Sequence, residues 1–121
     1  MPGTFDDAAL ALLRDAKEVR IRTSRSKRAG VIIWVVVADD GVFVRSVQGP
    51  AGKWYTTVAA DGRATLVLDA YELPVRAVAV ADQATIDAVS QAFLSKYGTS
   101  PYAQAMVRAE VLPTTLRLEV E

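Results

Sequence analysis

The sequence IIWVVVADDGVFVRSVQGPAGKWY, residues 32–55, decides the fold, because an apolar β-hairpin leads directly into a compact polar loop. A turn over residues 39–41 joins the two β-branched runs of this hairpin. The loop and the residues after it carry cations, a hydroxyl and paired aromatic rings: Arg45, Ser46, Lys53, Trp54 and Tyr55. Cations beside a hydroxyl and glycine-freed backbone amides suit a phosphate. We therefore interpret this segment as the candidate site for a small anionic, ring-bearing ligand.

The loop also has an interpretation without a ligand, as a hairpin exit with a solvated basic rim. A P-loop is excluded, because two residues separate Gly49 from Gly52 where the motif requires four. Trp54 also occupies the position of the magnesium-binding Ser or Thr of that motif. Nucleoside triphosphates are therefore not the expected ligands.

The length, composition and charge of the chain indicate its number of domains and the kinds of partner to expect. Its 121 residues are expected to form one domain over residues 1–121. Apolar residues make up 51% of the chain, so part of its apolar surface is expected in a homodimer interface, with Leu112 and Pro113 as candidates. Fourteen basic and fourteen acidic residues give a formal net charge of zero, which argues against nucleic acid or a membrane surface as partner.

The chain contains neither cysteine nor histidine. This excludes thiol nucleophiles, disulfides, a Ser-His-Asp relay and Cys or His metal sites, so no metal is expected. A redox role then requires a bound cofactor. Tyr55, Tyr97 and Tyr102 are available as proton donors, and the catalytic residue stays unknown. The apolar runs are shorter than the ~20 residues of a membrane span and the N-terminus does not resemble a secretory signal, so we expect a cytoplasmic protein.

The pattern of apolar residues predicts a mainly β chain of the α+β class, with peripheral helices. Strands are expected over residues 19–24, 31–38, 42–47, 64–68, 71–80 and 114–120, and helices over 5–17, 54–60, 83–97 and 101–107. The unalternated run 31–38 is typical of a strand covered on both faces. Six strands with a central meander favour a small barrel, because closure removes exposed edges.

Further groups are candidates for chemistry, and each has a structural alternative. The run Arg20, Arg22, Arg25, Lys27 and Arg28 provides a local positive field for an anionic tail, or is a solvated turn. Trp34 is a core residue or a ligand platform. The segment SKYGTSPY either lines a cleft edge with Lys96, Tyr97, Ser100 and Tyr102 or simply caps helix ends.

The blocks TSRSKRAG, IIWVVV, VFVRSVQGPAGKWY and RATLVLDAYELPVRAVAV, in this order, resemble the flavin-binding split-barrel superfamily of pyridoxamine phosphate oxidases and deazaflavin-dependent nitroreductases. With EVLPTTLRLEV at the end, the chain is more closely similar to a branch of small bacterial proteins known as a domain of unknown function. The resemblance covers about residues 15–120. It implies a six-stranded antiparallel split β-barrel, usually a homodimer, with FMN or a deazaflavin in a groove near the subunit interface.

The resemblance also implies the cofactor-binding residues. They form three blocks and an apolar wall: Thr23, Arg25 and Arg28; Arg45 and Ser46; Lys53, Trp54 and Tyr55; and Ile32, Ile33 and Trp34 as the wall. Ser24 stands where the relatives have glycine, Arg45 stands where they have lysine, and the proline that often precedes the aromatic pair is missing. These departures leave the choice between FMN and a deazaflavin open.

Three functions follow as hypotheses. The first is a flavin- or deazaflavin-dependent oxidoreductase that transfers hydride between the cofactor and a small-molecule substrate. The second is a barrel that binds a cofactor or another anion for storage or sensing without turnover. The third is a structural or interaction module with an empty groove.

Overall fold

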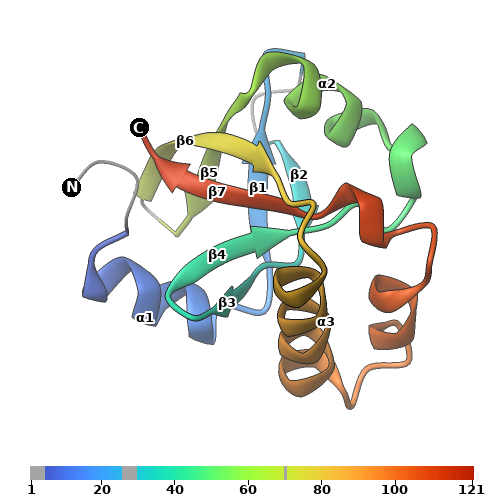
Figure 1. The fold of residues 1–121 in the computed structure, drawn as a ribbon. Helices are drawn as coiled ribbons and strands as arrows, with labels where there is room; N and C mark the ends of the chain where they lie inside the picture. Colours follow the sequence, from blue (N-terminus) through green and yellow to red (C-terminus); the bar gives the residue numbers. More distant parts are fainter. Residues whose placement is uncertain (1–4, 26–29, 70) are drawn as a thin grey trace.

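The computed structural model describes residues 5–25, 30–69 and 71–121, which form seven β-strands and three α-helices (Figure 1). The strands are β1 Val19–Arg22, β2 Val31–Ile33, β3 Val36–Ala38, β4 Gly41–Val44, β5 Arg63–Leu68, β6 Tyr71–Ala79 and β7 Leu116–Val120. The α-helices are α1 Asp7–Asp15, α2 Lys53–Asp61 and α3 Gln83–Tyr97, and the 3₁₀ helices are η1 Gly49–Ala51, η2 Ala103–Val107 and η3 Leu112–Thr114. The expected mainly β class with helices is confirmed.

The seven strands form one antiparallel sheet in the order β2-β1-β5-β6-β7-β4-β3. Strands β2 and β3 occupy opposite edges of this sheet, yet only Trp34 and Val35 separate them in the sequence. In a flat sheet the two edges would lie about 29 Å apart at the usual strand spacing. The three residue steps between β2 and β3 reach at most about 11 Å. The sheet therefore curls into a half-barrel that brings its two edges together.

The predicted number of six strands is wrong, because the single strand expected over residues 31–38 is two strands. At the break, Val35 directs its backbone to α3 instead of to a neighbouring strand. The Val35 N–H donates to the Tyr97 hydroxyl at 3.4 Å, and the Val35 carbonyl accepts from Lys96 Nζ at 2.7 Å. The apolar run therefore crosses from one sheet edge to the other. The expectation that this run is a strand covered on both faces is also wrong for β2, since Val31 and Ile32 are 40% and 50% exposed.

Two neighbouring residues at the end of α3, Lys96 and Tyr97, hold this crossing, and we call them the α3 clamp. The Tyr97 ring stacks on the Trp34 ring with centroids 3.9 Å apart and an interplanar angle of 5°. Its hydroxyl donates to the Lys17 carbonyl at 2.7 Å. Lys96 Nζ also donates to the Leu13 carbonyl at 2.9 Å, near the C-terminus of α1. The clamp thus joins α1, α3 and the crossing.

Burial shifts the pKa values of both clamp residues. Desolvation lowers the pKa of Lys96 to about 8, and the negative charge of Asp15 opposes this shift. Desolvation raises the pKa of Tyr97 to about 12, and its hydrogen bond with the Val35 backbone opposes this shift. At neutral pH Lys96 is therefore mostly charged and the Tyr97 hydroxyl is protonated, so both groups act as donors.

Among the described strands, β4 is the one in which successive side chains on both faces are buried. Its Val42 and Val44 belong to the inner cluster of buried side chains, which fills the half-barrel and includes Val35. Its Phe43 belongs to an outer cluster between the sheet and α3, which includes Val36. The neighbouring residues Val35 and Val36 therefore pack into different clusters. This explains why residues 31–38 do not alternate between apolar and polar side chains.

The strands β4 and β7 are shorter than expected. Where β4 ends and β7 begins, hydrogen bonds to side chains replace the backbone hydrogen bonds of the sheet. The Ser46 N–H donates to Thr114 Oγ1 at 2.9 Å, and Arg45 Nε donates to Thr115 Oγ1 at 2.8 Å. The ladder between β4 and β7 accordingly stops at the pair of Val44 with Leu116. On the β4 side, the residues after Val44 form the loop that leads to α2.

Replacing Tyr97 with Phe tests the contribution of the clamp hydroxyl to stability. Tyr97→Phe is expected to lower the free energy of unfolding by about 1–3 kcal/mol, because the buried Val35 N–H and the partly buried bond to the Lys17 carbonyl lose the hydroxyl as a partner. The matched control Tyr102→Phe changes a side chain that is 70% exposed, and its effect is expected to stay within about 0.5 kcal/mol. Urea denaturation followed by circular dichroism measures both, and equal effects of the two variants would contradict the role of the clamp.

Candidate functional site

Arg45 follows β4 and turns its side chain into the protein, where the residue is 1% exposed. Its guanidinium donates four hydrogen bonds, to Thr115 Oγ1 at 2.8 Å, Ser90 Oγ at 2.9 Å, the Met106 carbonyl at 3.0 Å and the Ile86 carbonyl at 2.9 Å. Burial lowers the pKa of Arg45 to about 10, so the group stays charged at neutral pH. The expectation that this guanidinium reaches out to a phosphate is therefore corrected: four of its five N–H donors bind groups inside the protein.

Ser46 is buried in the same way and shapes the loop. Its hydroxyl donates to the Gly49 carbonyl at 2.8 Å, so it is not a free donor for a phosphate. Gly52 passes so close that a Cβ atom there would lie 2.3 Å from Ser46 Oγ. Gly49 has a φ of +76°, which favours glycine. Ser46 and the two glycines thus fix the path of the chain into α2.

The first turn of α2 offers an uncapped, positively polarised end. Gly52 is the N-cap residue, and no side chain caps the helix. The first helical hydrogen bond runs from the Thr56 N–H to the Gly52 carbonyl at 3.0 Å, so the amides of residues 53–55 have no acceptor within the helix. Lys53 adds an exposed cation at the same place. Together these groups favour a negatively charged ligand group.

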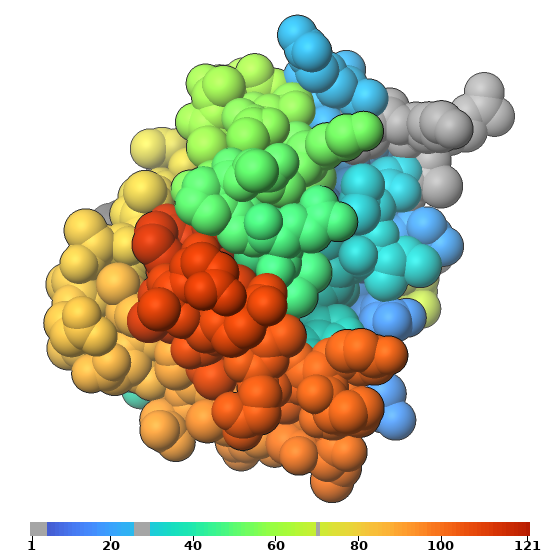
Figure 2. Space-filling model, turned by 90° about the vertical axis from the view of Figure 1, so that its right-hand side faces the viewer, coloured from blue at the N-terminus to red at the C-terminus, as the bar shows by residue number. Residues whose placement is uncertain are grey.

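A pocket of about 660 Å³ lies where the end of β2, the loop after β4, the start of α2 and η2 meet, and we call it the β2–α2 pocket. Figure 2 shows the face of the molecule on which these segments gather. The pocket is lined by Glu18, Val31, Ile32, Ile33, Trp34, Arg45, Ser46, Val47, Gln48, Lys53, Trp54, Tyr102 and Met106. Its volume falls within the range of about 300–1,000 Å³ that is usual for small-molecule sites.

The structure brings most of the predicted cofactor residues into this one pocket: Ile32, Ile33, Trp34, Arg45, Ser46, Lys53 and Trp54. Tyr55 instead packs against the inner cluster and meets the Trp54 ring edge-on, with centroids 6.2 Å apart. Thr23 lines a separate pocket with Asp61, and its hydroxyl accepts from the N–H of the exposed Arg25 at 3.1 Å. Arg28 lies outside the described residues. Within one chain the two described members of the first predicted block, Thr23 and Arg25, are therefore not among the residues that line the β2–α2 pocket.

Several lining residues were missed from the sequence. Met106 reaches the pocket because η2 is tied to Arg45 through the Met106 carbonyl, a contact across 61 positions that no local pattern indicates. Glu18, the residue before β1, adds an acidic residue to the lining. Tyr102, a candidate for a cleft edge in the sequence, does line the pocket.

Two other kinds of site receive no support in the part of the chain that the structure describes. No group of three or more acidic side chains there is arranged to hold a metal ion. None of the described helices has both the length and the apolar character that a membrane crossing requires.

The curled sheet and its peripheral helices define a split-barrel-like fold, and solved structures agree with this class. The conserved hypothetical protein Rv2991 from Mycobacterium tuberculosis matches with a TM-score of 0.65 at 11% identity, over 99% of this chain and 82% of that one. A putative pyridoxamine 5'-phosphate oxidase from Listeria innocua gives 0.60 at 10% identity, over 95% and 90%. The heme storage protein HutZ from Vibrio cholerae gives 0.61 at 10% identity, over 98% and 91%. At these identities the matches establish the fold alone.

The family of the chain follows from its sequence. Residues 9–118 match the family described as "Uncharacterized protein conserved in bacteria (DUF2255)", and the chain belongs to it. Comparison with curated proteins gives no match. The resemblance to a branch of small bacterial proteins known as a domain of unknown function is thereby confirmed, and the fold is split-barrel-like, as that resemblance implied.

The structural role of Arg45 predicts a large loss of stability on substitution. Arg45→Met is expected to lower the free energy of unfolding by about 2–4 kcal/mol, because two hydroxyls and two carbonyls lose a charged donor. The matched control Arg63→Met removes a surface ion pair with Glu121, in which the arginine side chain is 73% exposed, and should cost less than about 1 kcal/mol. Denaturant unfolding compares the two variants. An Arg45→Met protein with the stability of the control would contradict the buried network.

Proposed function

We propose that the β2–α2 pocket binds a flat aromatic cofactor that carries an anionic group, FMN or a deazaflavin, and that the protein is an oxidoreductase acting on a small molecule. The observation that carries this proposal is the combination of two indole rings with a cationic helix start in one pocket. Trp34 and Trp54 line the pocket together with Lys53, the first residue of α2. The fold alone does not identify the ligand, since the structural neighbours include a putative pyridoxamine 5'-phosphate oxidase and a heme storage protein.

The apolar lining supports a planar ring system. Ile32, Val47 and Met106 supply apolar surface beside the two indoles, and the α3 clamp keeps the Trp34 ring in place through its stack on Tyr97. Aromatic rings in proteins favour stacked or edge-on contact with other rings. An isoalloxazine or deazaflavin ring meets these requirements.

The anionic part of the ligand has its support at the start of α2. With the Arg45 guanidinium bound inside the protein, Lys53 and the free amides of residues 53–55 are the groups that favour a phosphate. We also propose a second set of contacts to an anionic tail of the ligand. These are Thr23, Arg25 and Arg28, provided either by the same chain or by a second subunit. When bound, the cofactor supplies hydride chemistry, and the chain supplies binding, orientation and an apolar wall.

The neighbour HutZ is described as a heme storage protein, which makes heme the competing ligand. Most heme proteins use His, Cys or Met as axial ligands, and these 121 residues contain neither His nor Cys. The pocket offers Met106, which is 4% exposed, and the exposed Tyr102. We therefore favour a flavin or deazaflavin over heme.

A homodimer is part of the proposal. Large apolar residues border the pocket and are exposed in the single chain: Val31 at 40%, Ile32 at 50%, Val47 at 46% and Tyr102 at 70%. An apolar rim around a ligand pocket is typical of a surface that a partner covers. A second copy of the chain would shield this rim and close the pocket.

Cofactor binding is tested directly by fluorescence quenching of FMN and of a deazaflavin. Lys53→Ala is expected to weaken binding about tenfold, because a charged hydrogen bond to the anionic group is lost. Lys17→Ala is the matched control, since this exposed lysine does not line the pocket, and it should bind as the wild type does.

Wild-type protein that binds neither cofactor would overturn the proposal. Tight binding without reduction of quinone or nitro substrates would leave the non-catalytic storage or sensing barrel. A lack of any ligand-dependent rise in melting temperature, together with self-association, would select the structural module.

Light scattering tests the dimer. Wild-type protein is expected to have the mass of a dimer at micromolar concentration, and Ile32→Glu is expected to be monomeric, because it places a charge in the apolar rim. Leu12→Glu is the matched control, a change on α1 at a residue that is 38% exposed, and it should remain dimeric. A monomer mass for the wild type would contradict the proposed assembly.

A further inference from the structure

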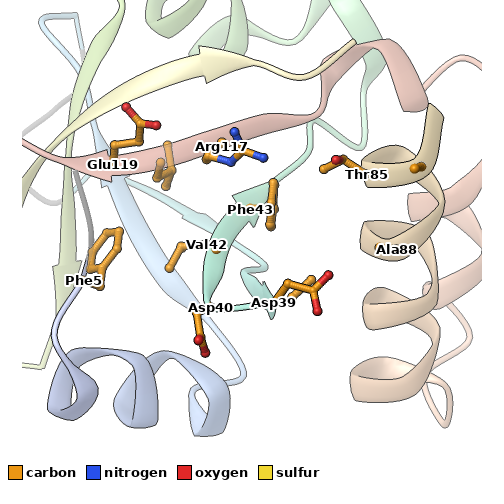
Figure 3. A pocket seen from close by; sticks show the side chains of 13 residues that line it. Phe5, Asp39, Asp40, Val42, Phe43, Thr85, Ala88, Arg117 and Glu119 are labelled. Carbon is orange, nitrogen blue, oxygen red and sulfur yellow. The ribbon is translucent and has the colours of Figure 1, made fainter. Parts of the chain in front are cut away.

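A second cavity of about 520 Å³ lies between α3 and the sheet, and none of the described residues lines both it and the β2–α2 pocket. The turn between β3 and β4, the strands β4 and β7, and the start of α3 form its walls (Figure 3). We call it the α3–β7 pocket. Its charged side chains belong to none of the proposed cofactor contacts, so it requires its own explanation.

The floor of the α3–β7 pocket is an arginine on an aromatic ring. Arg117 pairs in register with Phe43 across β7 and β4, and its guanidinium carbon lies 5.4 Å from the centroid of the Phe43 ring. Residue 41 is a glycine, and this leaves room for the Phe43 ring, because a Cβ atom at Gly41 would lie only 2.8 Å from it. Among the described residues, Arg117 takes part in no ion pair within 4 Å. The pocket thus holds a positioned cation with no carboxylate at ion-pair distance, although its charge contributes, after the hydrogen bonds from Thr85, to the lowered pKa of the Asp82 carboxyl.

The turn at one end of the pocket carries carboxylates in a demanding backbone conformation. Asp39 and Asp40 have φ values of +49° and +62°, in the left-handed region that favours glycine or asparagine. Asp40 forms an ion pair with Arg14 at 2.9 Å. In Figure 3 the Asp39 side chain points toward α3 and the Asp40 side chain points toward α1. Asp39 is left as the free carboxylate at this end of the pocket.

Helix α3 leaves room for a ligand beside this floor. It presents Ala84 and Ala88, one turn apart, and Thr85 between them. The Thr85 hydroxyl donates to the Asp82 carboxylate and keeps its oxygen lone pairs as acceptors. In Figure 3 the Thr85 side chain points from the start of α3 toward Arg117, while the alanines add only small side chains to the lining.

The balance of charge selects the chemistry of the ligand. Among the described residues that line the cavity, Arg117 is the one cation, whereas Asp39, Asp40 and Glu119 are carboxylates, and Arg14 neutralises one of them. A simple anion would meet two uncompensated carboxylates, and a simple cation would leave Arg117 unused. We propose that the α3–β7 pocket binds a small zwitterion of the basic amino-acid type. Its carboxylate binds Arg117 and its amino groups bind Asp39 and Glu119.

The test is a titration of the full chain with L-lysine, followed by amide chemical shifts in two-dimensional NMR. Saturable shifts are expected at Phe43, Thr85 and Arg117 at millimolar ligand. Two analogues separate the contributions on the unaltered protein: cadaverine lacks the carboxylate, and 6-aminohexanoate lacks the α-amine. Each is expected to bind at least about tenfold more weakly than L-lysine, because one charged contact is lost.

Two variants test the same contacts. Arg117→Met and Asp39→Asn are each expected to weaken L-lysine binding about tenfold. Their matched controls are Arg63→Met, on strand β5, and Asp69→Asn, another aspartate with positive φ, both outside the residues that line the pocket, and both should bind normally. Cadaverine that binds as well as L-lysine, or an absence of saturable shifts in the pocket, would overturn the proposal. FMN binding should be unaffected by all four substitutions, so this test is independent of the proposed cofactor site.

Discussion

The short crossing at Trp34 and Val35 constrains the whole molecule, because it joins the two opposite edges of a seven-stranded sheet. A connection of this length forces the sheet to curl, and the curl creates both the inner cluster and the outer surface on which α3 packs. The crossing gives up regular strand bonds at Val35, and α3 replaces them with the Tyr97 hydroxyl and Lys96 Nζ. Buried backbone groups require such partners, so the position of α3 is coupled to the closure of the sheet.

The same crossing builds the proposed binding site. Trp34 lies at the break, where it stacks on Tyr97 and lines the β2–α2 pocket. A second buried group, the Arg45 guanidinium, links the end of β4 to α3, η2 and the residues before β7. These two anchors hold Trp34 and Met106, which line the same pocket as Lys53 and Trp54. The walls of the pocket are therefore held by the same contacts that hold the fold.

Much of this arrangement could be predicted from the sequence. The turn at residues 39–41, the helix that begins near Trp54 and ends at Gly62, and the helix capped by Asp82 each follow from local residue chemistry. The crossing could not be predicted, because Val35 and Val36 are equally apolar whether they belong to one strand or to two sheet edges. The role of Arg45 was also hidden, since its four acceptors come from residues 86–115, far along the chain. A charged residue in a polar loop has the same local pattern whether it faces solvent or the interior.

The central claim is that the crossing and the start of α2 together form one aromatic ligand pocket. The chain has two tryptophans, Trp34 and Trp54, and both line that pocket, so their indole N–H resonances report on it directly. The most direct measurement is an NMR titration with FMN and, separately, with a deazaflavin. At least one of these cofactors is predicted to shift both indole resonances saturably and with the same apparent dissociation constant. Indole resonances that stay unchanged with both cofactors would contradict the claim.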